Sequence, residues 1–367
     1  MYILGINLSH HASICLLKDG KLVFYLEDDR LTGLKEKDFT RKNLLKCLIN
    51  ISYYTKYVDH VIFASYGKNY RHSVPSQDSE SDQIMIEYIK NRFNDYGFEY
   101  GEIHFHQEHH LYHASNAFYS STFNEAAALI LDGGGVWYND YTELREVESM
   151  YYFSSTEYET IKKVYSPRDI NFKDKPEKHN EKCIFSSTLS CGFMFNILCH
   201  ITGTGKAGKL MGLSSYGYSK NIDTKDWFLY DKECDIWYTN NQEILNCYRK
   251  YSGIKDLNPQ INHGIIQFEV KTAMNLAKKA QEETKDHTVR LIDQLLAKCN
   301  TKNIVLSGGY FLNCVNNYEY LKEFPDLKFY IDPIAHDGGT SIGAAKYLWH
   351  CTLKNQNRFP LETLYLG

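Results

Sequence analysis

An apolar segment that ends in three consecutive glycines constrains the fold of this chain more than any other feature. Residues 126–131 are all alanine, leucine or isoleucine, and Asp132, Gly133, Gly134 and Gly135 follow them directly. A short apolar run that stops at a glycine turn is typical of a buried β-strand. A turn made of glycines alone lets a phosphate group approach backbone N–H groups. We therefore expect a phosphate-facing turn at the end of a buried strand.

A histidine-rich segment precedes this strand. Residues 107–118 contain no glycine or proline and favour a helix, on which His109 and His113 lie one turn apart on one face. Two imidazoles on a helix and the carboxylate of Asp132 at a strand end are parts of a metal site. The alternative, a polar helix face without a ligand, stays open from this motif alone. The HExxH pattern of zinc proteases is absent because position 110 is His, which argues against a metalloprotease.

The second half of the chain repeats the arrangement of a strand followed by a glycine turn. An apolar run over residues 304–306 leads into Ser307, Gly308 and Gly309, and then through Asn313 into a helix. Such a turn suits a phosphate or an adenosine. Asp337 stands before a further pair of glycines, in the same context as Asp132.

The N-terminus adds a strand over residues 2–8, a polar turn, and a hairpin around Asp19-Gly20. This order is typical of the first phosphate-binding hairpin of an actin-like ATPase lobe. Together with the two Asp-Gly-Gly contexts in opposite halves, it predicts an α/β, duplicated actin-like fold. We expect two lobes of mixed β-sheets flanked by helices, with a site between them.

The 367 residues are too many for one small core, so two lobes are also expected from length. We predict a first lobe over 1–140, a β-rich insertion over 141–185 and a second lobe over 186–367. Amphipathic or apolar helices are expected over 41–56, 84–96, 186–201 and 268–298. Residues 218–262 are expected to form helices and loops.

Composition excludes several classes of protein. The net charge of −4 gives no strong electrostatic case for binding nucleic acid or a membrane surface. No apolar run approaches 18 residues, so no membrane span is expected. The ten cysteines include no CxxC pair and the N-terminus lacks the basic segment of a secretory signal, which predicts reduced thiols in the cytoplasm.

The segment Gly203–Lys209 nearly matches a phosphate-binding P-loop. The Ser or Thr that should follow to bind Mg²⁺ is Leu210, and no apolar strand precedes the segment, so we reject the P-loop interpretation. Lys209 could instead lie on a positively charged loop near a phosphate, and an ordinary surface loop is an equal alternative.

These motifs jointly resemble the N-terminal catalytic domain of O-carbamoyltransferases that modify antibiotics and nodulation factors, which has the actin-like ASKHA fold. The matching segments span the whole chain: 5–13, 27–35, 109–135, 208–217, 307–317 and 333–345. The resemblance implies that His109, His113, Asp132 and Asp337 hold one metal ion, iron in the family. The chemistry of these ligands also suits Zn²⁺ or Mn²⁺.

The resemblance also implies a reaction. The family makes carbamoyl adenylate from carbamoyl phosphate and ATP, with Mg²⁺, and transfers the carbamoyl group to a hydroxyl. We expect the acceptor to be a small molecule or a nucleotide; a nucleic acid is a weaker alternative, and a homodimer is also considered. The adenylate would lie against the cofactor-binding residues Gly133, Gly134, Gly135, Gly308, Gly309 and Asn313.

Three further residues are expected to take part in catalysis. His10 or His11 would assist proton transfer, since an imidazole accepts a proton near neutral pH. The alternative for both is a structural role in the turn. Lys209 would stabilise negative charge.

The sequence departs from the family pattern at several points. His11 replaces a usual Asp, Val136 a usual Glu and Gly33 a usual Arg. The family's C-terminal YrdC-like domain, which forms the adenylate, is expected to be absent from this chain. Three explanations stay open: a separate YrdC-like partner supplies its activity, the sequence is a truncated part of a longer chain, or the chain uses an adenylate made elsewhere. Two alternatives stay open: a kinase of the same fold, or a non-catalytic nucleotide-binding ASKHA protein.

Overall fold

Five strands form the first of two large β-sheets in the computed structural model, which describes residues 1–33, 41–65, 80–105, 108–138, 141–167, 175–252 and 269–366. The strands are β1 (Tyr2–Asn7), β2 (Ser13–Lys18), β3 (Lys21–Glu27), β4 (Tyr57–Ser65) and β5 (Glu99–Phe105). Their order is β3-β2-β1-β4-β5, with β2 antiparallel to both β1 and β3, and with β4 and β5 parallel to β1. The predicted hairpin is confirmed: Asp19 and Gly20, both with positive φ, join β2 to β3.

The second sheet repeats this topology. Its central strands are β6 (Glu125–Leu131), β8 (Tyr141–Ser154), β9 (Glu157–Pro167), β14 (Asn303–Ser307) and β15 (Lys328–Ile331). The order β9-β8-β6-β14-β15 has the same directions as the first sheet, with β6 in the place of β1. Three short strands extend it: β7 (Trp137–Tyr138), β10 (Glu177–Lys178) and β11 (Cys183–Phe185). The duplicated α/β fold expected from the sequence is therefore confirmed.

The expected boundaries at residues 140 and 185 do not follow the sheets. β6 lies before residue 140 but is hydrogen-bonded to β8 and, on its other side, to β14. Residues 141–185 are rich in strands, as predicted. The prediction that they form an insertion is wrong, because β8 and β9 belong to the second sheet.

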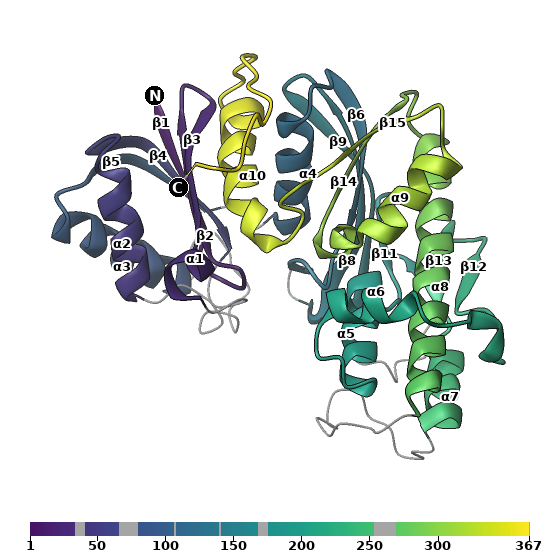
Figure 1. Cartoon of the computed structure of the whole chain (residues 1–367). Coiled ribbons are helices and arrows are strands. Elements are labelled where there is room, and N and C mark those ends of the chain that lie inside the picture. The colour runs from purple at the N-terminus through teal and green to yellow at the C-terminus, as the bar shows by residue number, and fades with distance from the viewer. Residues whose placement is uncertain are drawn as a thin grey trace.

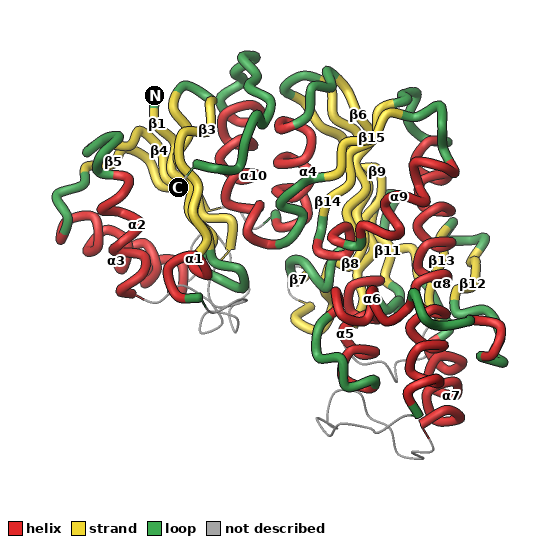
Figure 2. Tube along the Cα trace, viewed as in Figure 1, coloured by secondary structure: helices red, strands yellow, loops and turns green. Residues whose placement is uncertain are grey.

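Two helices lie side by side between the sheets, α4 (His109–Ser120) and α10 (Thr340–Tyr347), as Figures 1 and 2 show. Every residue of α4 is buried. α10 packs in one apolar cluster with residues of β1, β2 and β4. At the crossing, a Cβ atom on Gly343 would lie 1.9 Å from the Tyr112 carbonyl oxygen, so only glycine fits there. The two lobes thus meet along this helix pair.

The remaining helices surround the two sheets. Those of the first lobe are α1 (Asp28–Thr32), α2 (Arg41–Ile51) and α3 (Glu80–Asp95). Those of the second are α5 (Cys191–Ile201), α6 (Ala207–Ser214), α7 (Asn241–Ser252), α8 (Val270–Leu296) and α9 (Cys314–Glu323). Short turns are η2 (Ser219–Asn221), η3 (Gly309–Leu312), η4 (Asp337–Gly339) and η5 (Leu348–Thr352). Each predicted helix has a counterpart in α2, α3, α5 or α8, with ends that differ by up to five residues.

One prediction for the second lobe is wrong in part. The segment expected to hold only helices and loops contains a two-stranded hairpin of β12 (Phe228–Asp231) and β13 (Ile236–Thr239). Among the described residues, no helix combines the length and apolar character needed to span a membrane.

Candidate metal centre

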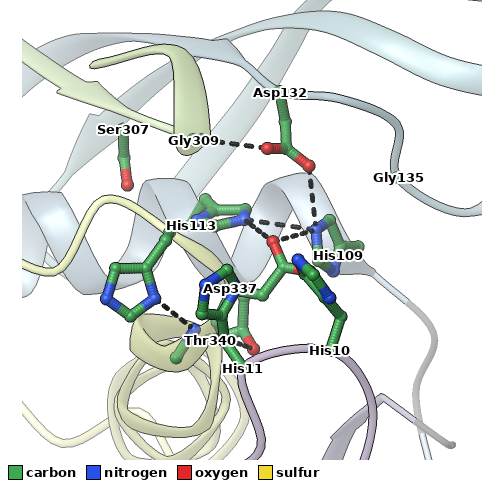
Figure 3. Close-up of polar contacts among 12 residues, drawn as sticks. His10, His11, His109, His113, Asp132, Gly135, Ser307, Gly309, Asp337 and Thr340 are labelled. Carbon is green, nitrogen blue, oxygen red and sulfur yellow. Dashed lines mark hydrogen bonds and ion pairs between the residues drawn. The ribbon is translucent and has the colours of Figure 1, made fainter. Parts of the chain in front are cut away.

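Four side chains from three features of the fold converge between the lobes. His109 and His113 lie one turn apart at the start of α4, Asp132 follows the last residue of β6, and Asp337 opens η4 ahead of α10. Figure 3 shows one carboxylate oxygen of Asp337 facing both imidazoles. The structure therefore brings together all four residues that the sequence suggested as metal ligands.

The distances within this cluster suit a single metal ion. His113 Nε2 lies 3.2 Å from His109 Nε2, and His109 Nε2 lies 3.4 Å from Asp132 Oδ2. Asp337 Oδ1 lies 3.5 Å from His109 Nε2 and 3.7 Å from His113 Nε2. Two ligands bound tetrahedrally to one ion at the usual bond lengths lie about 3.3 Å apart. The residues present thus fit a metal ion, and their role as its ligands stays a prediction.

The electrostatics of the cluster favour a cation. Burial raises the pKa of both Asp132 and Asp337, yet the imidazoles beside them hold both pKa values below the usual range. Burial lowers the pKa of His109, but the two carboxylates outweigh it and raise the value to about 10. Two buried carboxylates therefore need a positive charge at this point, which either an imidazolium or a divalent cation supplies.

Hydrogen bonds hold the Asp132 carboxylate and the backbone at Asp337 in place. Asp132 Oδ1 accepts a hydrogen bond from the Gly309 N–H at 2.9 Å, so the glycine turn after β14 holds the ligand at the end of β6. Buried Asn7, the last residue of β1, donates from Nδ2 to the carbonyl of Asp337 at 3.1 Å. The same amide donates to the carbonyls of His10 and His11. Sequence reasoning missed Asn7, whose only signal was a polar residue at the end of an apolar run.

Close packing requires glycine at some positions of the two glycine turns and not at others. A Cβ atom on Gly308, which has φ of 98°, would lie 2.3 Å from the Leu131 carbonyl oxygen, and one on Gly135 would lie 2.5 Å from Glu146 Oε2. Packing therefore excludes side chains at these two positions. A Cβ atom on Gly133 would meet no atom within 4 Å, so the turn is open there. The Gly134 carbonyl accepts a hydrogen bond from Arg145.

The predicted catalytic histidines lie at the edge of the cluster. His10 and His11 form the turn after β1, their ring centroids 4.2 Å apart, and His11 adopts a positive φ of 52°. The His11 ring lies 4.6 Å from the His336 ring, and His336 directly precedes Asp337. The structure thus places both histidines beside the Asp337 turn (Figure 3).

Lys209 and Asn313 lie outside the four-residue cluster. Lys209 is exposed on α6, and within the described residues no ion pair joins its side chain to a carboxylate. Asn313 caps α9, accepting a hydrogen bond from the Asn316 N–H, and exchanges two side-chain hydrogen bonds with Gln281. Its observed contacts are structural, and adenylate binding by Asn313 stays a prediction.

A cluster of buried polar side chains lies beneath α4, and the sequence analysis did not identify it. His110 Nδ1 lies 2.8 Å from Ser149 Oγ, and Lys163 Nζ lies 2.9 Å from Glu146 Oε1. Burial lowers the pKa of His110 to about 4, and although burial opposes it, His110 and Lys163 lower the pKa of Glu146 to about 2. His110 therefore ties α4 to β8 through a hydrogen bond, while the ion pair of Glu146 and Lys163 joins β8 to β9.

Comparisons with known proteins bear on the family and the fold of this chain. Residues 2–346 match the model of the family described as the carbamoyltransferase N-terminus. The chain belongs to this family. An uncharacterized protein of Synechocystis sp. is 26% identical to this chain over 391 residues, which cover 97% of this chain and 58% of the relative. Another uncharacterized protein, from Methanocaldococcus jannaschii, is 24% identical over 374 residues, which cover 100% of this chain and 60% of the relative. The domain thus spans about three fifths of these relatives.

Solved structures confirm the fold. The full-length HypF structure in its phosphate- and nucleotide-bound form has a TM-score of 0.54 at 14% identity, covering 94% of this chain and 55% of HypF. HypF of T. kodakarensis gives a TM-score of 0.55 at 13% identity, covering 96% of this chain and 48% of that HypF chain. At this identity the similarity shows a shared ASKHA-type fold alone.

Proposed function

We propose that this carbamoyltransferase domain transfers a carbamoyl group from carbamoyl adenylate to a hydroxyl of a small molecule or nucleotide. The observation that carries the proposal is the four-residue cluster between the lobes, which lies directly beside two glycine turns. Family membership supports carbamoyl transfer in general. The cluster supports a reaction in which charge on a phosphate or a carbonyl must be neutralised.

His109, His113, Asp132 and Asp337 would hold a divalent cation. Mixed imidazole and carboxylate ligands suit Fe²⁺, and also Zn²⁺ or Mn²⁺. When bound, such an ion supplies Lewis-acid polarisation of a carbonyl or phosphoryl oxygen. The Gly309 N–H would keep the Asp132 carboxylate oriented, and the Asn7 amide would hold the backbone at Asp337, since hydrogen bonds around metal ligands fix their geometry.

The chain's own groups account for the remaining requirements. The acceptor hydroxyl oxygen forms a bond to the carbamoyl carbon, and the bond from that carbon to the phosphate oxygen breaks. AMP leaves with the electron pair, and the hydroxyl proton passes to an imidazole of His10 or His11. The open backbone at Gly133 would cradle the leaving phosphate through its N–H groups. Charge stabilisation by Lys209 stays a prediction, since within the described residues no ion pair or hydrogen bond joins this lysine to the cluster.

The donor would be made from carbamoyl phosphate and Mg²⁺-bound ATP by a YrdC-like activity, on a partner protein or a further domain. We place the reaction in the cytoplasm, where both compounds occur and where ten unpaired cysteines remain reduced.

Metal analysis of the purified protein tests the site. About one iron or zinc per chain is expected at the cluster, and this equivalent is lost in His113→Ala and in Asp337→Ala. The exposed residues His179 and Asp326 provide matched controls, because His179→Ala and Asp326→Ala remove the same side chains elsewhere. Absence of metal from the wild-type cluster after anaerobic reconstitution contradicts the proposed site.

Transfer itself is tested with the metal-loaded chain, radiolabelled carbamoyl phosphate, ATP and a purified YrdC-like protein. Label is expected in a hydroxylated acceptor, with one AMP released for each carbamoyl group transferred. AMP release without labelled acceptor, across a panel of sugars, cyclitols and nucleotides, would favour the non-catalytic nucleotide-binding alternative.

A further inference from the structure

A second group of metal-ligating side chains lies on strands that contribute nothing to the central cluster. His60 belongs to β4, and Glu102 and His104 belong to its parallel neighbour β5. In the register of these strands His60 pairs with Glu102, and His104 follows two positions later. Because side chains alternate along a strand, all three lie on one face of the sheet. We infer that they form a divalent transition-metal site, of the kind that binds Zn²⁺.

The three potential ligand atoms form a compact triangle. His60 Nδ1 lies 3.1 Å from His104 Nε2, and each of these nitrogens lies 3.6 Å from Glu102 Oε2. A tetrahedral zinc ion holds neighbouring ligands about 3.3 Å apart. The sides of the triangle therefore match one face of such a tetrahedron, and they cover the same range as the distances in the central cluster.

A hydrogen bond between the two histidines explains only part of this arrangement. Two neutral imidazoles share one proton, which accounts for the 3.1 Å separation. The Glu102 carboxylate then adds a third set of lone pairs at equal distance from both nitrogens. One shared proton can bond to only two of the three atoms, whereas a cation at the centre of the triangle can bind all of them.

Exposure and donor type decide which ion fits. The imidazoles are 14% and 16% exposed, whereas the Glu102 side chain is 71% exposed. An ion can thus enter from solvent, and a water molecule can complete a fourth position. Two imidazoles favour Zn²⁺ over Ca²⁺ or Mg²⁺, which prefer oxygen ligands throughout.

The site would fasten the edge of the first sheet. β5 is the last strand in the described order of that sheet, and its side chains are mostly exposed or half-buried. An ion held by His60 and His104 would join β5 to β4 through side chains as well as backbone. His104 precedes His109 by only five positions, so the joined strand end directly precedes the helix that carries the central histidines.

Zinc binding to the full chain tests this inference independently of the proposed function. The background is His113→Ala/Asp337→Ala, which removes two potential ligands of the central cluster. After chelator treatment, equilibration with Zn²⁺ and dialysis, this background is expected to keep one zinc per chain. Adding His60→Ala or His104→Ala is expected to remove it, whereas Glu102→Gln weakens zinc affinity at least about tenfold. Glu99→Gln, an equal charge change on the same strand, should leave zinc content unchanged.

A second measurement keeps the test valid if the double variant His113→Ala/Asp337→Ala does not fold. In the otherwise wild-type chain, His60→Ala is expected to lower zinc content by one equivalent and to reduce the visible absorption of bound Co²⁺. The inference is overturned if the background retains no zinc while His60→Ala leaves the wild-type count unchanged. It is equally overturned if zinc content is the same with and without His60 and His104, and the two rings then form a hydrogen-bonded pair only.

Discussion

At the scale of single residues, Asn7 links both halves of the candidate site. Its Nδ2 group donates to the carbonyls of His10, His11 and Asp337, and its Oδ1 accepts from Ser9. Asn7→Ala leaves three carbonyls without this donor, so we expect a loss of about 1–3 kcal/mol in the free energy of unfolding. Because Asp337 loses its support, metal affinity should also fall about 10- to 100-fold. Urea unfolding and metal titration check both effects.

Asn357, an exposed asparagine, is the control for this change. Asn357→Ala is expected to leave stability and metal affinity unchanged. If Asn7→Ala behaved like this control, the amide would have no part in holding Asp337.

At the scale of elements, the contact between α4 and α10 determines how His109 and His113 of α4 meet Asp337, which lies in η4 directly before α10. A Cβ atom at position 343 would overlap the Tyr112 carbonyl. Gly343→Ala is therefore expected to force the helices apart, to lower the unfolding free energy by about 1–3 kcal/mol or more, and to reduce metal content. Circular dichroism melts and elemental analysis measure the two results.

Gly212 on α6 gives the opposite expectation. A Cβ atom there would meet no atom within 4 Å. Gly212→Ala should raise the unfolding free energy by about 0.5–1 kcal/mol, since alanine favours a helix over glycine. Destabilisation of both variants by equal amounts would mean that close packing at the helix crossing is not the cause.

The elements also show why some features were predictable and others were not. The histidine spacing on α4 and the Asp-Gly-Gly turn after β6 are local patterns, so the sequence indicated His109, His113 and Asp132, and the family resemblance added Asp337. β8 was assigned to an insertion because register shifts between Glu146 and Glu148, and between Met150 and Tyr151, interrupt its regular pairing with β9. Strands β12 and β13 have four residues each, too few for a clear period. The bond from Asn7 to Asp337 spans 330 positions, beyond any local pattern.

At the scale of the whole molecule, a buried amine lies where the two halves meet. Lys346 on α10 is 1% exposed, and its Nζ donates to Ser120 Oγ on α4 at 2.8 Å. Burial lowers the pKa of Lys346 to about 7, and the nearby Asp332 opposes this only in part. The unfolded chain therefore binds the proton of this lysine between about pH 7 and pH 10.5, where the folded chain has released it. Folding then incurs a cost that is largest at or below pH 7 and declines as pH rises.

We predict that Lys346→Met changes the pH dependence of stability with a defined sign. Because the variant has no amine to deprotonate, its free energy of unfolding should exceed that of the wild type by the largest amount near pH 7. This advantage should shrink by about 1.4 kcal/mol for each pH unit up to about pH 10. Urea unfolding of both proteins at pH 7, 8 and 9 measures the difference, and the exposed Lys232→Met provides the control. A difference that stays constant or grows with pH would mean that Lys346 keeps its proton in the folded protein, with its charge balanced at the junction of the lobes.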